Sequence, residues 1–540
     1  RITGAHESFP GFIDNPTLNS TDFNTGYRSS ARASLLFKPT DALSFRLTAF
    51  TQRIDSNGNG AIDVVGAARQ PRNPQPNRFN LVNGFRQPRF NETIVDNSIQ
   101  TYSLDVTWDL GWATLQSLTS RGRLKTFFTS DITSFNAVPG LTNGQAFAPL
   151  WPVPISIRQQ QAEGLKKFNQ EVRLSSSPGK FEWQGGIFYS TEDTVFNQFY
   201  DSYPLSDWFL AVGGPPIGGS TQPVSYEEWA VFGEGTYKFT DRFDLSLGLR
   251  HTDSEQTSVQ TLYPGLLYPR FAINNSRVED KDTTYSLSPR FTISDDVMVY
   301  ARIATGFRPG GPLFAQPPAP QFYTSDQTVN YEAGFRGAFF DGRLTADLAA
   351  YHIDWTDIQV ITRVTINNIT YTTVGNAGTA ESQGLEWNIR FKPIQDLTFG
   401  IVGAYTDATL TENAPSLGGR AGDQLPYVPK LSYSLNADYA WPAFGDFEGY
   451  ASGTYSFVDS RYGDFSTAAT ATNHDKLPGY SNVNIQVGLR NERYTLQAYV
   501  NNLTNEVGIL NYSNEGGANQ SGFANVTTPR TIGVLLQARF

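Results

Sequence analysis

The sequence has 540 residues, a formal net charge of −10, 39% hydrophobic and 14% aromatic residues, and no cysteine. The absence of cysteine excludes disulfides, thiol catalysis and cysteine-ligated metals, and the acidic balance argues against a nucleic-acid-binding face. No segment approaches the roughly 18 uncharged apolar residues that a membrane helix needs. A membrane-spanning β-strand is still allowed, because only every second residue of such a strand faces lipid.

Segments that alternate between apolar and polar residues recur along the chain. In chain order, the clearest are 101–110, 243–250, 285–293, 483–489 and 528–540. Alternation with a period of two indicates β-strands whose two faces lie in different environments. A β-sandwich and a membrane barrel both contain such strands, so alternation alone leaves both architectures open.

The lengths of the connections favour the barrel. Short polar turns are expected at 39–43, 176–180, 239–243, 293–297, 339–344 and 393–397. Longer connections, rich in Pro, Asn and Gly, are expected at 55–98, 128–164, 193–224, 252–278, 306–328 and 504–528. Outer-membrane barrels alternate short turns at one membrane face with long loops at the other, whereas a sandwich follows no such rule. Aromatic residues near strand ends, such as Trp108 and Trp112, are typical of the girdles at the membrane boundaries.

The sequence therefore predicts an all-β fold over residues 1–540. We expect a transmembrane antiparallel up-and-down β-barrel of about 20 strands, each with about ten residues across the lipid. A barrel of this size encloses a lumen that side chains cannot fill. It is therefore either plugged by another part of the protein or open as a pore.

Several segments resemble one family, the TonB-dependent outer-membrane receptors. Segments 329–360 and 376–408, and the closing pair 500–506 and 528–540, resemble the late barrel strands of that family. Upstream, segments 10–16, 168–176 and 226–252 fit the same family, so the resemblance covers essentially the whole chain. It implies a barrel of about 22 strands in the bacterial outer membrane. Such a receptor imports a scarce nutrient, is energised by the TonB complex and is not an enzyme.

The resemblance also implies parts that the sequence does not show. Family members carry a plug domain and a short energy-coupling box before the barrel, and nothing here resembles either. Arg1 does not begin a signal peptide. Segment 10–16 normally lies a few strands into the barrel. We therefore expect this chain to be the C-terminal part of a longer receptor, without the plug and the first strands.

The last strand carries a second feature of the family. Its apolar face is formed by Ile532, Val534, Leu536, Ala538 and Phe540, and we expect this face to meet lipid. A terminal aromatic residue on such a strand resembles the signal that the barrel-insertion machinery reads. Phe540 would also anchor the aromatic girdle, and the two roles are compatible.

The candidate ligand contacts lie in the long connections. Arg308, followed by Gly310 and Gly311, would offer a cation and bare backbone to an anionic ligand, although a plain loop start explains the same residues. Aromatic residues in flexible loops suit flat or glycosidic ligands, but equally suit packing between loops. The aromatic candidates are Trp208, Phe209, Phe314 and Phe322.

Three arginines lie at polar-face positions of predicted strands, and we expect them to face the lumen. They are Arg302, Arg336 and Arg390. The resemblance implies that such luminal arginines hold the plug by ion pairs and hydrogen bonds. They would also suit a path for anionic chelates.

One segment resembles the start of a calcium loop. Asp55, Asn57, Asn59 and Asp63 are hard oxygen ligands with suitable spacing. Gly66 stands where the closing Glu is expected, so a plain loop rich in Gly and Asn explains the segment as well. We expect no cofactor other than this weakly indicated structural calcium.

Two histidines have an acidic residue two positions further on. The pairs are His251 with Asp253 and His352 with Asp354. An acid–base role is conceivable, but no residue completes a hydrolase triad, so polar lumen or rim residues explain both pairs better.

The sequence thus predicts an outer-membrane receptor for a large scarce solute, most often a ferric siderophore in this family. Cobalamin, a glycan or an aromatic compound are alternative ligands, and a plug-less passive pore is the alternative function. The expected partners are outer-membrane lipid and lipopolysaccharide, the TonB complex through the missing N-terminal part, and the insertion machinery. We expect a monomer.

Overall fold

The computed structural model describes residues 1–58, 60–65, 80–81, 84–87, 89–131, 155–204, 217–265, 270–313, 321–366, 369–376, 378–415, 418–463, 465, 476–514 and 521–539. Within these ranges the regular secondary structure consists of β-strands. The described residues include no helix that is long and apolar enough to cross a membrane.

Twenty strands form one antiparallel sheet in which spatial neighbours follow chain order. They are β1 (Ile2–Phe9), β2 (Gly26–Thr40), β3 (Leu43–Asn57), β6 (Ile94–Asp109), β7 (Ala113–Asp131), β8 (Ile155–Ser176), β9 (Phe181–Pro204), β10 (Gly219–Lys238), β11 (Phe243–Tyr263), β12 (Ala272–Ser294), β13 (Val297–Arg308), β16 (Asp326–Phe339), β17 (Leu344–Thr356), β20 (Thr379–Ile394), β21 (Leu397–Leu410), β22 (Leu431–Pro442), β23 (Glu448–Val458), β26 (Tyr480–Arg490), β27 (Tyr494–Asn501) and β30 (Thr531–Ala538). This up-and-down order confirms the predicted fold class and the predicted number of strands.

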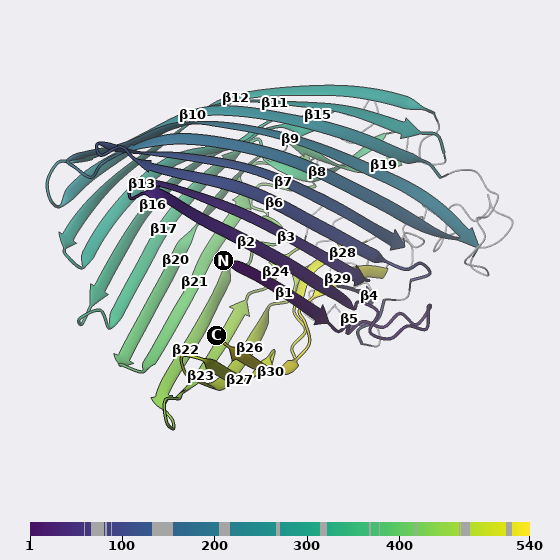
Figure 1. Ribbon diagram of the computed structural model, residues 1–540. Helices are drawn as coiled ribbons and strands as arrows, with labels where there is room; N and C mark the ends of the chain where they lie inside the picture. Colours follow the sequence, from purple (N-terminus) through teal and green to yellow (C-terminus); the bar gives the residue numbers. More distant parts are fainter. Residues whose placement is uncertain are drawn as a thin grey trace.

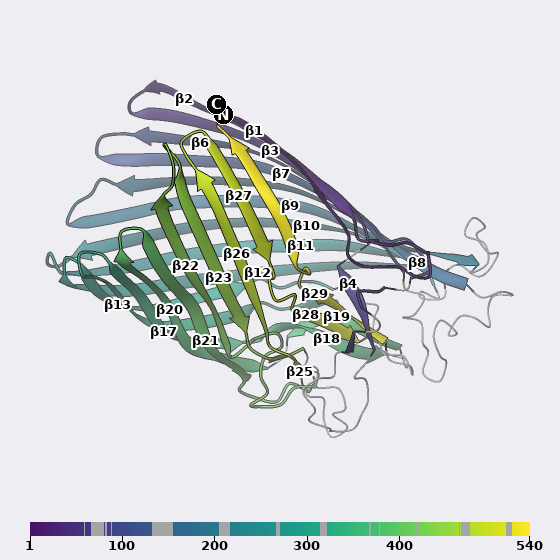
Figure 2. The same cartoon turned by 90° about the horizontal axis from the view of Figure 1, so that it is seen from below.

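The sheet curls round a central space, and its two edge strands are β1 and β30 (Figures 1 and 2). Among the described residues β1 pairs with β2, β30 pairs with β27, and no register joins β1 to β30. Both edges are exposed, with Ile2 84% and Ile532 74% accessible. The described strands therefore leave a seam between β1 and β30.

The two faces of the sheet differ as the alternation predicts. The outer face exposes large apolar side chains, including Leu47, Leu104, Leu249, Phe399 and Val487. The inner face carries ion pairs between neighbouring strands, including Lys238–Glu182, Arg290–Asp244 and Arg336–Asp347. An apolar belt of this extent is stable only in apolar surroundings, which a bilayer provides.

All six predicted short turns join consecutive strands at one end of the sheet. The turn between β16 and β17 illustrates their chemistry, because Phe340, Asp341 and Gly342 have φ values of 56°, 56° and 77°. Positive φ is least strained at Gly and tolerated by Asp, so this sequence suits a tight reversal. We call this end of the sheet the turn end and the opposite end the loop end.

The predicted long connections are partly wrong, because several strands continue far into them. Strands β8, β9, β11 and β12 have 22, 24, 21 and 23 residues. They include residues 155–164, 193–204, 252–263 and 272–278, which the sequence analysis had assigned to long connections. Beyond the apolar belt both faces of a strand meet water, so alternation stops while backbone pairing continues. The TDSEQTS segment (252–258) of β11 is such a case.

Small sheets lie at the loop end. One consists of β4 (Ala61–Val65), β5 (Asn80–Leu81), β28 (Ile509–Asn514) and β29 (Ser521–Val526). Three hairpins accompany it: β14 (Gly311–Pro312) with β15 (Phe322–Tyr323), β18 (Gln359–Ile366) with β19 (Ile369–Asn376), and β24 (Arg461–Tyr462) with β25 (Lys476–Leu477). A buried apolar cluster supports the four-stranded sheet and is formed by Ile13, Ile62, Leu477, Ile509, Ala524 and Val526.

Candidate functional site

A hydrogen-bonded network ties the loop end of β13 to β16 and β18. The Arg308 guanidinium forms an ion pair with Asp326 (Nη2–Oδ2 2.5 Å) and donates to the Gln359 carbonyl at 3.0 Å. Asp326 is 3% exposed and also accepts from Trp355 Nε1 and from the Gln359 backbone amide, each at 3.1 Å. Gln359 Nε2 lies 2.9–3.1 Å from three backbone carbonyl oxygens. The network holds the loop after β13 against the hairpin β18–β19.

The donors that the sequence analysis assigned to an anion are engaged by this protein's own carboxylates. Gly310 donates its backbone amide to Asp280 at 2.8 Å, and Arg308 is paired with Asp326. Tyr323 packs beside Gly311, and burial raises the pKa of its phenol above the ordinary value. A ligand contact for Arg308 stays a prediction, and it would require the ion pair with Asp326 to open.

The predicted aromatic contacts are described in part. Phe322 lies in β15 and is 50% exposed, so its ring is available at the loop end. Trp208, Phe209 and Phe314 lie outside the described residues, as does Phe540.

The three arginines predicted to face the lumen lie on the inner face. Arg336 on β16 pairs with Asp347 on β17 (Nε–Oδ2 3.0 Å), and Arg302 is the register partner of Glu332. Arg336 and Arg390 line one hollow of about 660 Å³ near the turn end, together with Asp347. This part of the wall therefore offers both charges to whatever occupies the lumen.

A second hollow of about 660 Å³ adjoins it on the same face. Tyr300 and Glu332 lie in its wall, and the Tyr300 hydroxyl donates to Glu332 at 2.6 Å. The Arg336 guanidinium lies 5.5 Å from the centre of the Tyr300 ring, within the range of a cation–π contact. Side chains that hold one another in this way form a fixed polar wall rather than a mobile one.

The residues of the proposed calcium loop are only partly placed. Asp55 on β3 forms an ion pair with Arg53 (Nε–Oδ2 2.9 Å), and Asn57 is the last residue of that strand. Asn59 and the side chain of Asp63 lie outside the described residues. Within the described ranges no three acidic, histidine or cysteine side chains form a metal-binding group, so calcium stays a prediction.

The two histidine pairs face away from the lumen. His352 Nε2 lies 3.0 Å from Asp354 Oδ1, and its ring lies 6.3 Å from the ring of Tyr331 on the outer face. His251 is hydrogen-bonded to Thr283 rather than to Asp253, whose carboxylate pairs with Lys281. The sequence analysis placed both histidines at lumen or rim positions, and their outward direction contradicts the lumen.

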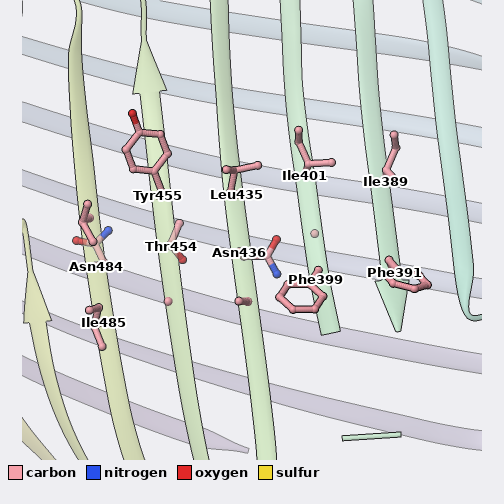
Figure 3. A pocket seen from close by; sticks show the side chains of 14 residues that line it. Ile389, Phe391, Phe399, Ile401, Leu435, Asn436, Thr454, Tyr455, Asn484 and Ile485 are labelled. Carbon is pink, nitrogen blue, oxygen red and sulfur yellow. The ribbon is translucent and has the colours of Figure 1, made fainter. Parts of the chain in front are cut away.

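A largely apolar hollow of the described residues lies outside the lumen. Figure 3 shows Phe391, Phe399, Ile401, Leu435 and Ile485 around it, on neighbouring strands from β20 to β26. Its volume is about 520 Å³, and register pairing places these side chains on the outer apolar face. It belongs to the surface that meets lipid, not to a path for a polar solute.

The sequence analysis missed Asp326 and Gln359, the two residues that organise the loop end. Each stands at the start of a strand, but their partners are 18 and 51 residues away in the chain. No local pattern shows a contact of that range. An acidic residue directly before an alternating segment was the one available signal.

Comparison with known proteins agrees with this architecture. A family model described as TonB dependent receptor-like, beta-barrel matches residues 44–503. The chain is 23% identical over 335 residues to the pesticin receptor of Yersinia pestis, and the aligned region covers 59% of this chain and 45% of that receptor. It is 28% identical over 285 residues to the metal-pseudopaline receptor CntO of Pseudomonas aeruginosa (strain UCBPP-PA14), covering 49% of this chain and 37% of that receptor. The chain thus spans less than half the length of the curated relatives it matches.

Solved structures show the same fold at low identity. The ferric yersiniabactin uptake receptor FyuA from Yersinia pestis superimposes with a TM-score of 0.78 at 17% identity, covering 100% of this chain and 75% of that one. The ferric-catecholate import receptor Fiu from E. coli K12, in its closed form, gives a TM-score of 0.71 at 14% identity, covering 99% and 76%. The family model covers most of the chain, and the 20-stranded sheet with its apolar outer face has the architecture that this model describes. The chain therefore belongs to the TonB-dependent receptor-like β-barrel family of the bacterial outer membrane.

Proposed function

We propose that this chain forms the barrel of a receptor for energy-coupled uptake of a ferric siderophore or a similar metal chelate. The observation that carries the proposal is a wide lumen with a charged inner wall beneath a loop end built from packed small sheets. A large polar solute needs such a lumen, and loops held on a rigid sheet supply selective contacts. The curated relatives are named as receptors, and one name specifies a metal chelate.

The proposal assigns the remaining partners by the same reasoning. Energy would come from the TonB complex, acting on a part of the receptor outside the described strands. Outer-membrane lipid and lipopolysaccharide would cover the apolar face, and the insertion machinery would recognise the C-terminal strand that ends at Phe540. No residue of the chain takes a catalytic role in this proposal.

Uptake of radioactive iron tests the function directly. The complete gene would be expressed in a receptor-deficient Gram-negative strain and supplied with catecholate, phenolate and citrate chelates of ferric iron. We expect one chelate class to be taken up, and uptake to stop when the inner-membrane energy source is dissipated. Uptake of none of the chelates, or uptake that continues without energy, would overturn the proposal.

A further inference from the structure

Four basic side chains gather on the outer face of β7 and β8. Arg121, Arg123 and Lys125 occupy alternate positions of β7, and Lys166 on β8 is the register partner of Arg123. All four are exposed. Strands β6, β7 and β8 lie side by side in the sheet (Figure 1). We call these four residues the basic patch.

Register shows where the basic patch lies relative to the apolar belt. The register partners of Arg121 are Tyr102 on β6 and Phe168 on β8. Tyr102 and the outward Leu104 on the same strand are 54% and 38% exposed, so this face is the one that meets lipid. From the level of these aromatic rings the basic patch continues toward the loop end. It therefore occupies the boundary where lipid headgroups of the outer leaflet lie.

Within the described residues, none of the four basic side chains forms an ion pair or a hydrogen bond. Other outward cations of the same sheet are neutralised by neighbours. Arg277, for example, lies 2.9 Å from Glu255 and 2.7 Å from Glu279. The register partner of Lys166 on β9 is Asp193, whose carboxylate accepts a hydrogen bond from Ser225. The Ser225 hydroxyl leaves the negative charge of Asp193 in place, but the four basic groups of the patch outnumber this one carboxylate, so the basic patch keeps a net positive charge.

Polar side chains directly beside the patch behave differently. Thr119 donates to Gln170 Oε1 at 2.6 Å, and Gln170 Nε2 donates to Ser117 at 3.0 Å. These three groups satisfy one another at the membrane surface. Like charges on facing and adjacent strand positions repel, and Asp193 offsets only one of the four cations, so further anionic groups close by would stabilise the cluster.

We propose that the basic patch binds the phosphate groups of a phosphorylated glycolipid of the outer leaflet, of the lipopolysaccharide class. Each of the two arginine guanidinium groups can bind a phosphate through two parallel N–H···O hydrogen bonds, and the two lysines add positive charges beside them. Tyr102 and Phe168, at the lower edge of the patch, offer ring faces to the sugar and to the first carbons of the acyl chains. This surface is separate from the lumen, so the proposal does not depend on which solute the receptor carries.

Lipid titration tests the proposal on the complete protein. The purified receptor in detergent would be titrated with lipid A that carries both phosphates, with lipid A freed of phosphate, and with phosphatidylglycerol, and the bound lipid counted by native mass spectrometry. We expect the diphosphorylated form to bind at least tenfold more tightly than either other lipid. Replacing all four residues (R121Q, R123Q, K125Q and K166Q) should weaken its binding on the order of 100-fold.

Smaller changes guard against loss of folding. The pair R123Q and K166Q should weaken binding about tenfold, since two of four charges are removed. R277Q is the matched control, because Arg277 lies on the same row of register partners and is already neutralised by Glu255 and Glu279. It should leave the affinity within about twofold. Equal binding of phosphorylated and phosphate-free lipid A, equal binding of phosphatidylglycerol, or a fourfold variant that binds like the native protein would each overturn the proposal.

Discussion

Asp326 is the single residue on which the order of the loop end depends most. Its carboxylate is almost fully buried and accepts from a guanidinium, an indole and a backbone amide. Removing a buried carboxylate that accepts from three donors leaves all three donors without their acceptor. Because Arg308 is half exposed, water replaces part of what the guanidinium loses. The indole and the amide of Gln359 have less access to water.

We predict that D326N loosens the loop end without unfolding the barrel. The amide keeps one acceptor oxygen but loses the charge, so the local opening free energy should fall by about 1–3 kcal/mol. Hydrogen exchange at the amides of residues 324–326 and 357–359 should accelerate by roughly tenfold or more. D354N is the matched control, since Asp354 pairs with His352 at the exposed outer face. Unchanged exchange in D326N would show that the network does not order these segments.

At the scale of elements, the four-stranded sheet at the loop end links the two sides of the seam. Strand β4 follows β3 near one edge of the large sheet, and β29 precedes β30 at the other. Their pairing runs from Ser521 with Val65 to Asn525 with Ala61. The register partners Ala524 and Ile62 are fully buried in the apolar cluster. This small sheet is therefore a direct connection between the first and last parts of the chain.

We predict that A524E breaks this connection. A carboxylate at a position with no accessible surface has no partner, which costs several kcal/mol, on the order of 3. The temperature at which the barrel unfolds in SDS should then be at least several degrees lower than for the native protein. This temperature is read from the gel mobility of heated and unheated samples. G60E provides the comparison, because a Cβ at Gly60 approaches only Asn525 Oδ1, at 3.9 Å. Equal transition temperatures for A524E and the native protein would show that the seam is held elsewhere.

Whether the sequence predicts a strand depends on the environments of its two faces. Alternation identified the strands that cross lipid, such as 101–110 and 243–250, because one face meets lipid and the other the lumen. Alternation did not identify the loop-end parts of β9 and β12, because both faces of these parts meet water. The short strands β4 and β29 carry too few residues for a period to show. Arg302, Arg336 and Arg390 lie on the inner face, and the face of a strand residue follows from the alternation alone. The pairing of Arg308 with Asp326 depends on a contact across a loop, which alternation does not show.

At the scale of the whole molecule, the number of strands decides what the lumen can do. Twenty strands about 4.8 Å apart and tilted about 45° enclose a space roughly 40 Å across between backbones. Side chains from opposite walls cannot meet over that distance. The receptor and the passive pore share this wall and differ in whether another part of the protein fills the space.

Single-channel recording separates these two functions. We predict that the product of the complete gene, isolated from outer membranes and placed in a planar bilayer, is nearly silent, because energy-coupled uptake requires a lumen that is closed at rest. An open lumen of this width would instead conduct in large, steady steps. The double variant R336A and R390A tests whether any steps that are seen come from ions passing along this wall. Both arginines line the hollow near the turn end, so their loss should lower the preference for anions only where ions already pass. Large steps in the native protein, with anion preference reduced in the double variant, would establish the passive pore and exclude the gated receptor.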